Sequence, residues 1–487
     1  MQRPVRVWGA RPQARHLLPV VAGSGLSVLM AVATPGLVAI AAPRPELAPV
    51  KPGAGSVAGS AAPPELSTMS AGSSLEPGQT MTAAGSRYVL EMERDGDLAL
   101  LWLSKPVWQT NTEGHNGAHA QIQHDGNFVV YMGTKALWSS GTGGHPYGAY
   151  TLSVLSNGNI VVSEPSGAGM WSSKSETAGV RIVPEDTPAF NGDAGDPNVV
   201  RNGTTYYAFT TGTALGNHIQ VLVSSAPSTG YHSYTNKSYG STGLPNTPSW
   251  EQPNTQTSPG VFAYDKHWVM FYDASLAGHS QGTGFDCISV ATATTLTATS
   301  PVFTDRSSGP LICQPGYGGV LDPTPFYDSA TGKAYVLWKS NDGSSSQASH
   351  IWSQELNAAG TGLAGSPVEL LTNNTNSFPW ETTLDDPSMV NDNGRDFLMF
   401  SVGGFLSAGY SEAFAVCSGP TGPCTQPAGN PFLKSYDHAY GPGGGSLFSD
   451  ASGNWWIDYA AWNSSSCQSY SCGARRLLYV APIDLGG

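Results

Sequence analysis

The chain has 487 residues, of which 12% are charged, and it contains 59 glycines, 20 tyrosines and 13 tryptophans. Low charge with many aromatic and glycine residues is typical of a β-rich extracellular protein, and it is unlike a helical cytosolic enzyme, in which Lys, Glu and Leu dominate. The net charge of −13 argues against a nucleic-acid partner, because binding to phosphates requires a basic surface.

The beginning of the chain has the order of an export signal. Basic residues from Arg3 to Arg15 come first, and an apolar stretch over residues 17–41 follows and ends in "AIA". We therefore predict a cleaved signal peptide over residues 1–42 and a secreted protein. The apolar stretch is also long enough for an uncleaved membrane anchor, although glycines and prolines interrupt it. No later stretch is long and apolar enough to span a bilayer, so no membrane association is expected after cleavage.

A linker and a threefold repeat follow. Residues 43–73 are rich in Pro, Ala, Gly and Ser, which predicts a linker. Residues 74–178 contain three copies of a turn and a strand, "ERDGDLALL", "QHDGNFVVY" and "LSNGNIVVS". Each turn is followed 13 or 14 residues later by a tryptophan, at Trp108, Trp138 and Trp171. This period predicts a threefold β-prism or trefoil-like domain, with the tryptophans buried together at its centre.

The middle copy of this repeat carries a row of polar side chains. Gln123, Asp125, Asn127 and Tyr131 recur at even spacing and lie on one face of a strand, where they can hydrogen-bond adjacent sugar hydroxyls. The row resembles the mannose-binding motif of the bulb-type (monocot) lectins, over roughly residues 74–176. The resemblance implies a mannose-type glycan as partner and one intact site, because the other two copies depart from the motif. A lectin-like spacer without sugar affinity is the alternative.

The remainder of the chain, residues 186–487, repeats a short motif in which a proline follows a residue that is polar in most copies. Each copy continues with a short strand, a turn rich in Asp, Asn and Gly, and a second strand with aromatic residues. Five such repeats predict a five-bladed β-propeller and make the whole chain all-β. The first strand of each blade would line the central channel, so residues beside the prolines would converge. The prolines are Pro197, Pro259, Pro323, Pro387 and Pro442, which are 62, 64, 64 and 55 residues apart.

These repeats, with the segments "LDPTPFYDSATGKAYVLWKS", "CISVAT" and "VCSGPTGPC", resemble glycoside hydrolase family 43 over about residues 190–485. Its members cleave arabinose- and xylose-containing glycans. The resemblance implies that Asp196 is the general base, that Asp322 orients the acid and tunes its pKa, and that Asp385 is the general acid. Such an inverting hydrolase needs one ionised and one protonated carboxyl. The family has Glu at the acid position, so Asp385 has a shorter reach, and Asp386 and Glu381 are alternative donors.

Other pocket residues are also expected from the loops near the prolines. Trp250 and Trp380 would stack on a sugar ring, unless they are buried between blades. Asp386 would contact the substrate if it is not the acid, and Lys339 is a further candidate. The last blade lacks the histidine that related enzymes often place near a central metal or water, so we expect no metal and no cofactor.

All six cysteines follow residue 286, and their number fits an oxidising compartment. Two close pairs each close a short loop, which leaves the other two cysteines to pair with each other. A metal cluster is the competing interpretation, but no CxxC spacing with a partner His is present. The predicted disulfides are Cys417–Cys424, Cys467–Cys472 and Cys287–Cys313.

The expected activity is hydrolysis of an arabinose- or xylose-containing polysaccharide. An Asp-Pro pair can simply cap a turn. A non-catalytic carbohydrate-binding or adhesive protein with a degenerate propeller is therefore the alternative function.

Overall fold

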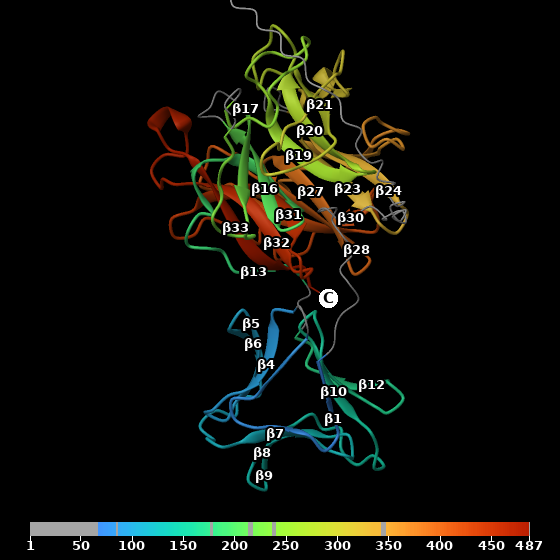
Figure 1. Cartoon of the computed structure of the whole chain (residues 1–487). Helices are drawn as coiled ribbons and strands as arrows, with labels where there is room; N and C mark the ends of the chain where they lie inside the picture. Colours follow the sequence, from blue (N-terminus) through green and yellow to red (C-terminus); the bar gives the residue numbers. More distant parts are fainter. Residues whose placement is uncertain are drawn as a thin grey trace, which may run out of the picture. The chain divides into compact units, whose positions relative to one another are not determined.

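The computed structural model describes residues 67–83, 86–175, 179–212, 218–235, 240–341 and 347–486. Within these ranges the regular elements are β-strands and two single-turn 3-10 helices, Pro315–Tyr317 and Tyr470–Cys472, which confirms the predicted all-β class (Figure 1). The described part of the chain contains no helix that is long and apolar enough to cross a membrane. The predicted signal peptide lies outside these residues, as does most of the predicted linker.

The N-terminal unit consists of three four-stranded antiparallel sheets, and each begins with a strand from the first part of the unit. Strand β1 lies inside the range 43–73 that was predicted to be a linker, so the unit begins earlier than expected. The sequence signal was weak because β1 has one apolar residue, Met69, which packs into the core. The sheets are β1 (Ser67–Ser70), β10 (Thr151–Val154), β11 (Ile160–Ser163) and β12 (Gly169–Ser172); β2 (Ser74–Leu75), β7 (His119–Ile122), β8 (Phe128–Met132) and β9 (Lys135–Ser139); β3 (Thr80–Thr82), β4 (Tyr88–Met92), β5 (Leu98–Trp102) and β6 (Lys105–Gln109).

The three tryptophans of the repeat meet as predicted. Trp108, Trp138 and Trp171 lie edge to face, with ring centroids 5.6 to 5.9 Å apart. They are half-buried and not fully buried, and they pack against the core of the unit. Edge-to-face packing of aromatic rings is favourable beyond the burial of area, so this triad ties the three sheets together.

The turn of each repeat is held by two polar side chains. The first of them accepts the backbone N–H two residues later at 3.1 Å, which is an Asx turn. The second accepts a hydroxyl from a Ser or Thr pair about 13 residues further along. The turn residues are therefore structural in every copy, whatever else they do. The matched sets are Asp95, Asp97, Thr110 and Thr112; Asp125, Asn127, Ser140 and Thr142; and Asn157, Asn159, Ser173 and Ser175.

The C-terminal unit is a five-bladed propeller of antiparallel sheets. The first strands of the five blades contact one another in a closed ring, β15, β19, β23, β27 and β31. The blades are β15 (Gly195–Asn202), β16 (Thr205–Gly212), β17 (His218–Ser224) and β18 (His232–Ser233); β19 (Thr257–Tyr264), β20 (His267–Ser275), β21 (Asp286–Ala293) and β22 (Ile312–Cys313); β23 (Val320–Asp328), β24 (Lys333–Ser340), β25 (His350–Glu355) and β26 (Val368–Thr372); β27 (Leu384–Asp392), β28 (Arg395–Val402), β29 (Ser411–Cys417) and β30 (Cys424–Thr425); β31 (Tyr440–Ser449), β32 (Trp455–Trp462) and β33 (Arg476–Asp484).

The last blade is completed by the beginning of the unit. Strand β13 (Arg181–Ile182) pairs with the end of β33, and β14 (Phe190–Asp193) pairs with the beginning of the same strand. Strand pairing with the last blade therefore includes two residues that precede residue 186, the predicted boundary. Pairing of the first segment with the last blade closes the ring and removes an open sheet edge. The sequence did not reveal β13 because it has only two paired residues.

The repeated proline motif forms a β-bulge in the first strand of each blade. In all five blades the register shifts at the proline, and the residue before the proline lies in the left-handed region. Aspartate tolerates this region better than most residues, and proline needs no ladder partner in a bulge. A bulge re-aims the side chain that it carries. The left-handed residues are Asp196, Ser258, Asp322, Asp386 and Gly441, with φ of 44°, 48°, 57°, 48° and 60°.

All three predicted disulfides are present. Cys287–Cys313 joins β21 to β22, and Cys417–Cys424 joins β29 to β30. Both therefore secure the short outer strand of a blade. Cys467–Cys472 closes a loop between β32 and β33.

Candidate active site

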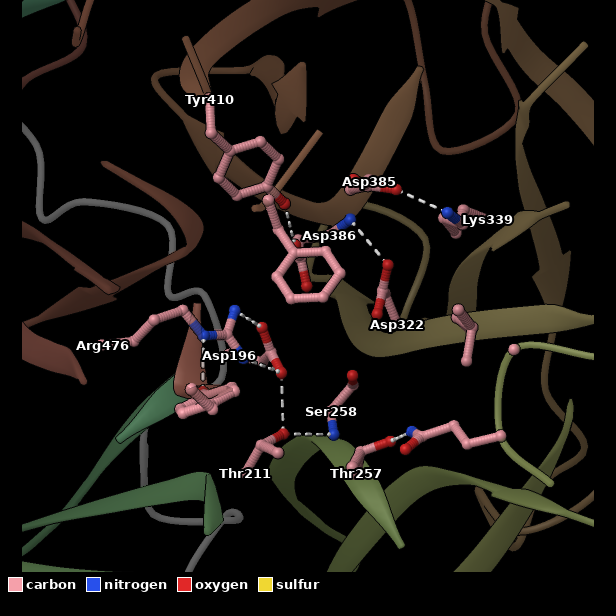
Figure 2. A pocket seen from close by; sticks show the side chains of 15 residues that line it. Asp196, Thr211, Thr257, Ser258, Asp322, Lys339, Asp385, Asp386, Tyr410 and Arg476 are labelled. Carbon is pink, nitrogen blue, oxygen red and sulfur yellow. Dashed lines mark hydrogen bonds and ion pairs between the residues drawn. The ribbon is translucent and has the colours of Figure 1, made fainter. Parts of the chain in front are cut away.

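The bulges open onto one polar cavity of about 400 Å³, a volume suited to a few sugar rings. All five blades or the loops beside them contribute to its wall, because the bulges bring their side chains to the same end of the ring (Figure 2). The lining residues are Asp196, Thr211, Thr257, Ser258, Gln281, Gly282, Leu321, Asp322, Lys339, Asp385, Asp386, Phe405, Tyr410, Tyr470 and Arg476.

On one side of the cavity, Asp196 is held by a buried arginine. The guanidinium of Arg476 donates to both carboxylate oxygens, at 2.6 and 3.0 Å, and Thr211 donates its hydroxyl at 2.7 Å. Burial alone would lower the pKa of Arg476, but Asp196 and Tyr470 raise it well above the ordinary value. Because the guanidinium stays protonated and its fork matches a carboxylate, Asp196 is fixed as an oriented carboxylate.

Asp322 lies between two other aspartates. Its carboxylate accepts the backbone N–H of Asp386 at 3.1 Å, and its own N–H donates to Asp273 at 3.3 Å. Burial raises the pKa of Asp322 to about 6; the Lys339 ammonium opposes this shift, and Asp385 and Asp196 add to it. Asp273 is fully buried in β20, and the sequence analysis did not single it out.

The adjacent residues Asp385 and Asp386 have different partners. Asp385 lies before the bulge and forms an ion pair with Lys339, with 2.5 Å between Oδ1 and Nζ. Burial would lower the pKa of Lys339, but the carboxylates of Asp385 and Asp322 outweigh burial and raise it. Asp386 lies in the bulge and accepts the hydroxyl of Tyr410 at 2.6 Å. Burial, followed by the charges of Asp322, Asp196 and Asp385, raises the pKa of Asp386 well above its ordinary value.

Glu381, the third alternative for the acid, does not line the cavity. Its side chain is fully buried, and it accepts hydrogen bonds from Gln426 at 2.8 Å and from the backbone of Asn374 at 2.7 Å. It therefore supports a loop of the fourth blade and has no access to the cavity.

The two predicted stacking tryptophans do not line the cavity either. Trp250 donates to Ser307 at 2.9 Å, and Trp380 packs beside Phe378 against the core between two blades. Three aromatic residues that the sequence analysis missed, Phe405, Tyr410 and Tyr470, line the cavity instead. Phe405 and Tyr410 lie in an irregular loop and Tyr470 begins a single-turn 3-10 helix, in segments rich in Gly and Ser where no strand periodicity points to the direction of a side chain.

The glycine tract of the last blade is required by close packing behind the cavity. A Cβ at Gly443 would lie 2.1 Å from the ring of Tyr410, and one at Gly445 would lie 2.8 Å from Glu412 Oε1. Glu412 is fully buried, accepts hydrogen bonds from Ser401 and from the backbone of Gly445, and has a second oxygen without a partner. Burial raises its pKa to about 7. In the described part of the chain, no group of three or more His, Cys, Asp or Glu residues is arranged to hold a metal ion.

In the N-terminal unit, Gln123, Asp125 and Asn127 lie in the turn between β7 and β8, and Tyr131 lies in β8, so the prediction that all four lie on one face of a strand was wrong. Gln123 donates its amide to the Tyr131 hydroxyl at 3.0 Å. Asp125 accepts the backbone N–H of Asn127 with one oxygen and that of Gly144 with the other, at 3.1 and 3.2 Å. Asn127 uses its carbonyl oxygen within the turn, so its amide nitrogen is the group that it can offer to a ligand.

Comparison with known proteins places the C-terminal unit. Residues 186–485 match the model of glycosyl hydrolases family 43. A crystal structure of a thermostable family-43 glycoside hydrolase is 20% identical, covers 61% of this chain and 92% of its own length, and has a TM-score of 0.51. An endo-1,4-β-xylanase from Bacteroides thetaiotaomicron is 21% identical, with coverages of 62% and 97% and a TM-score of 0.48.

The N-terminal unit is similar to a monomeric monocot mannose-binding lectin from Gastrodia elata, which is 30% identical, covers 22% of this chain and 96% of its own length, and has a TM-score of 0.21. No curated protein sequence matches the chain. The family model spans more than half of the chain, all five blades and the carboxylate-lined cavity, and the chain therefore belongs to glycosyl hydrolases family 43.

Proposed function

We propose that this glycoside hydrolase cleaves arabinose- or xylose-containing polysaccharide by a single displacement that inverts the anomeric carbon. One observation carries the proposal. The same cavity contains a carboxylate in an ion pair with Arg476, and carboxyl groups that burial and mutual repulsion favour in the protonated form. An inverting hydrolase requires this pair of states on opposite sides of the scissile bond.

In this mechanism, Asp196 accepts a proton from the attacking water. Arg476 and Thr211 fix the direction of its carboxylate, so the water is oriented before the reaction and little reorganisation is needed. The acid comes from the adjacent pair Asp385 and Asp386, and it gives its proton to the leaving glycosidic oxygen. Asp322 contacts the backbone of this pair and repels its negative charge, which favours the protonated form of the acid.

Phe405 and Tyr470 supply apolar area to the wall of this polar cavity, and we assign to them the stacking on a sugar ring that the sequence analysis gave to tryptophans. Phe405 is 41% exposed. Its backbone carbonyl accepts the indole N–H of Trp462 at 2.7 Å, which anchors the loop.

We further propose that the N-terminal unit binds a mannose-type glycan through Gln123, Asp125, Asn127 and Tyr131, and that the protein is secreted. Three disulfides are consistent with an oxidising compartment. The sugar row brings amide, carboxylate and phenol groups to one turn, which is the donor and acceptor mixture that sugar hydroxyls require.

A panel of substrates tests the hydrolase, with Asp196→Asn as the inactive control. The panel contains aryl α-L-arabinofuranosides, aryl β-D-xylosides, debranched arabinan and xylan. Hydrolysis of one of these by the wild type, and none by the variant, is the expected result. If both proteins leave every substrate intact while the polysaccharides still bind, the propeller is a binding module and the alternative function holds.

A further inference from the structure

The family has a Glu two residues before the fourth-blade proline, and in this chain that position is occupied by Asp385. The structure, however, pairs Asp385 with Lys339 at 2.5 Å, and both side chains are nearly enclosed, with exposed fractions of 11% and 6%. A buried ion pair that loses one charge leaves the other charge uncompensated, which is strongly unfavourable. A proton on Asp385 would leave the buried ammonium without its counter-charge, so Asp385 is less suited than its neighbour Asp386 to carry the reacting proton.

The surroundings of Asp386 differ from those of Asp385, because its nearest partners are carboxyl groups and a tyrosine hydroxyl. It lies in the bulge, at the position that Asp196 and Asp322 occupy in their own blades, and its side chain lies among theirs (Figure 2). Its Oδ2 atom accepts the hydroxyl of Tyr410. Because Tyr410 donates to that oxygen, the proton of a neutral Asp386 resides on Oδ1. The charged and titratable groups that face it are Asp322 of β23, Asp196 of β15, Asp385 of its own strand, Tyr410 from the loop before β29 and the Lys339 ammonium of β24.

Resting on the proposed hydrolase function, we propose that Asp386 is the proton donor to the leaving glycosidic oxygen, and that Asp385 and Lys339 are a positioning pair. As the bond from the anomeric carbon to the glycosidic oxygen breaks, the Asp386 proton goes to that oxygen. The water oxygen bonds to the anomeric carbon, and the water proton goes to Asp196. Asp386 is left ionised and regains a proton from solvent, while Asp196 releases one, so the cycle is balanced.

This assignment moves the acid by one residue, and the fold accounts for the shift. The residue before the proline is in the left-handed region, and the bulge directs it toward the cavity. Room for Tyr410, which holds the side chain of Asp386, is provided by Gly443, where any Cβ would overlap the tyrosine ring.

The test compares full-length Asp386→Asn and Asp385→Asn on two substrates of the same sugar, one with a dinitrophenyl leaving group and one with an unactivated sugar leaving group. Loss of a general acid costs about 10²- to 10⁴-fold when the leaving group needs protonation. We expect Asp386→Asn to show this loss on the unactivated substrate and less than about a tenfold loss on the dinitrophenyl glycoside. Asp385→Asn is expected to lower both rates by a similar factor. In this variant, kcat/KM should still fall at alkaline pH, at the same pH as in the wild type.

A second variant, Tyr410→Phe, keeps the proton of Asp386 and removes the hydrogen bond that favours its charged form. If Asp386 is the acid, the alkaline limb moves to higher pH in this variant, which a purely structural role of Tyr410 would not produce. A selective loss on the unactivated substrate in Asp385→Asn, with an unmoved limb in Tyr410→Phe, would overturn the assignment to Asp386. An inactive wild type would instead contradict the hydrolase function itself, so the two failures are distinguishable.

Discussion

Arg476 and Asp196 are 280 residues apart in the chain and form a two-point ion pair, at 2.6 and 3.0 Å, between the last and first blades of the propeller. Both side chains are nearly buried, with exposed fractions of 7% and 14%. The pair therefore has two roles. It joins the first and last blades where the ring closes, and it orients the carboxylate of the proposed base.

Replacement of Arg476 by lysine should lower kcat/KM by about a hundredfold, because a single ammonium cannot reproduce the planar two-point contact that orients Asp196. Steady-state kinetics on an activated aryl glycoside provides the measurement. The neighbouring Arg475 is exposed and serves as the matched control, since Arg475→Lys should leave the rate unchanged. Equal activity in both variants would remove Arg476 from the mechanism.

Phe405→Ala should raise KM by about tenfold with a smaller change in kcat, because loss of a ring that stacks on the substrate removes about 1–2 kcal/mol of binding. The adjacent Leu406 is 54% exposed and does not line the cavity, so Leu406→Ala is the control for effects on the loop. A KM that rises equally in both variants would indicate a change in the loop and not the loss of a stacking contact.

Asp125→Ala should abolish binding of methyl mannoside to the full-length protein, measured by titration calorimetry. The control is Asp95→Ala, since Asp95 caps the equivalent turn of the first repeat, where the other residues of the sugar row are replaced. Both substitutions remove the hydrogen bond of the turn, and Asp125→Ala also removes the one from Gly144, so loss of binding counts as sugar contact only if the melting temperatures of the two variants agree. If wild-type protein binds no mannoside, the unit is a spacer.

Glu412 should make stability depend on pH. Burial raises its folded-state pKa to about 7, above the ordinary value of 4.5, so the folded state binds the proton more tightly than the unfolded state does. Its contribution to stability is complete below pH 4.5 and is lost as the pH rises toward 7, by an amount on the order of 3 kcal/mol.

Glu412→Gln keeps an oxygen for Ser401 and Gly445, and it should flatten the fall in melting temperature across this range. Asp265→Asn, at an exposed side chain of the same unit, is the control. A wild-type melting temperature that does not fall between pH 5 and pH 7.5, or an equal fall in Glu412→Gln, would contradict this account.

The parts of the fold that could be predicted are those that depend on residues adjacent in the sequence. A bulge needs a residue that tolerates the left-handed region followed by proline, and both neighbours stand together in the sequence, so Asp196, Asp322 and Asp386 could be found from the repeat. The disulfides within short loops were predictable for the same reason.

The partners of these aspartates could not be predicted in this way. Tyr410 and Arg476 reach the cavity from a loop and a strand end that belong to other parts of the chain, and no local pattern states which direction they face. Lys339 was expected as a candidate and does line the cavity, but its ion pair with Asp385, 46 residues away, could not be predicted. Trp250 and Trp380 were expected in the cavity because they lie near prolines, but apolar packing and a hydrogen bond hold them elsewhere.

The stereochemistry of the first sugar released tests the central claim most directly. Proton NMR, recorded within the first minutes of hydrolysis of an activated glycoside, should show the anomer opposite to that of the substrate, and Asp196→Asn should release none. Direct displacement by a water that Asp196 activates allows no other outcome. First-formed sugar with the anomeric configuration of the substrate, or hydrolysis by Asp196→Asn at the wild-type rate, would contradict the account.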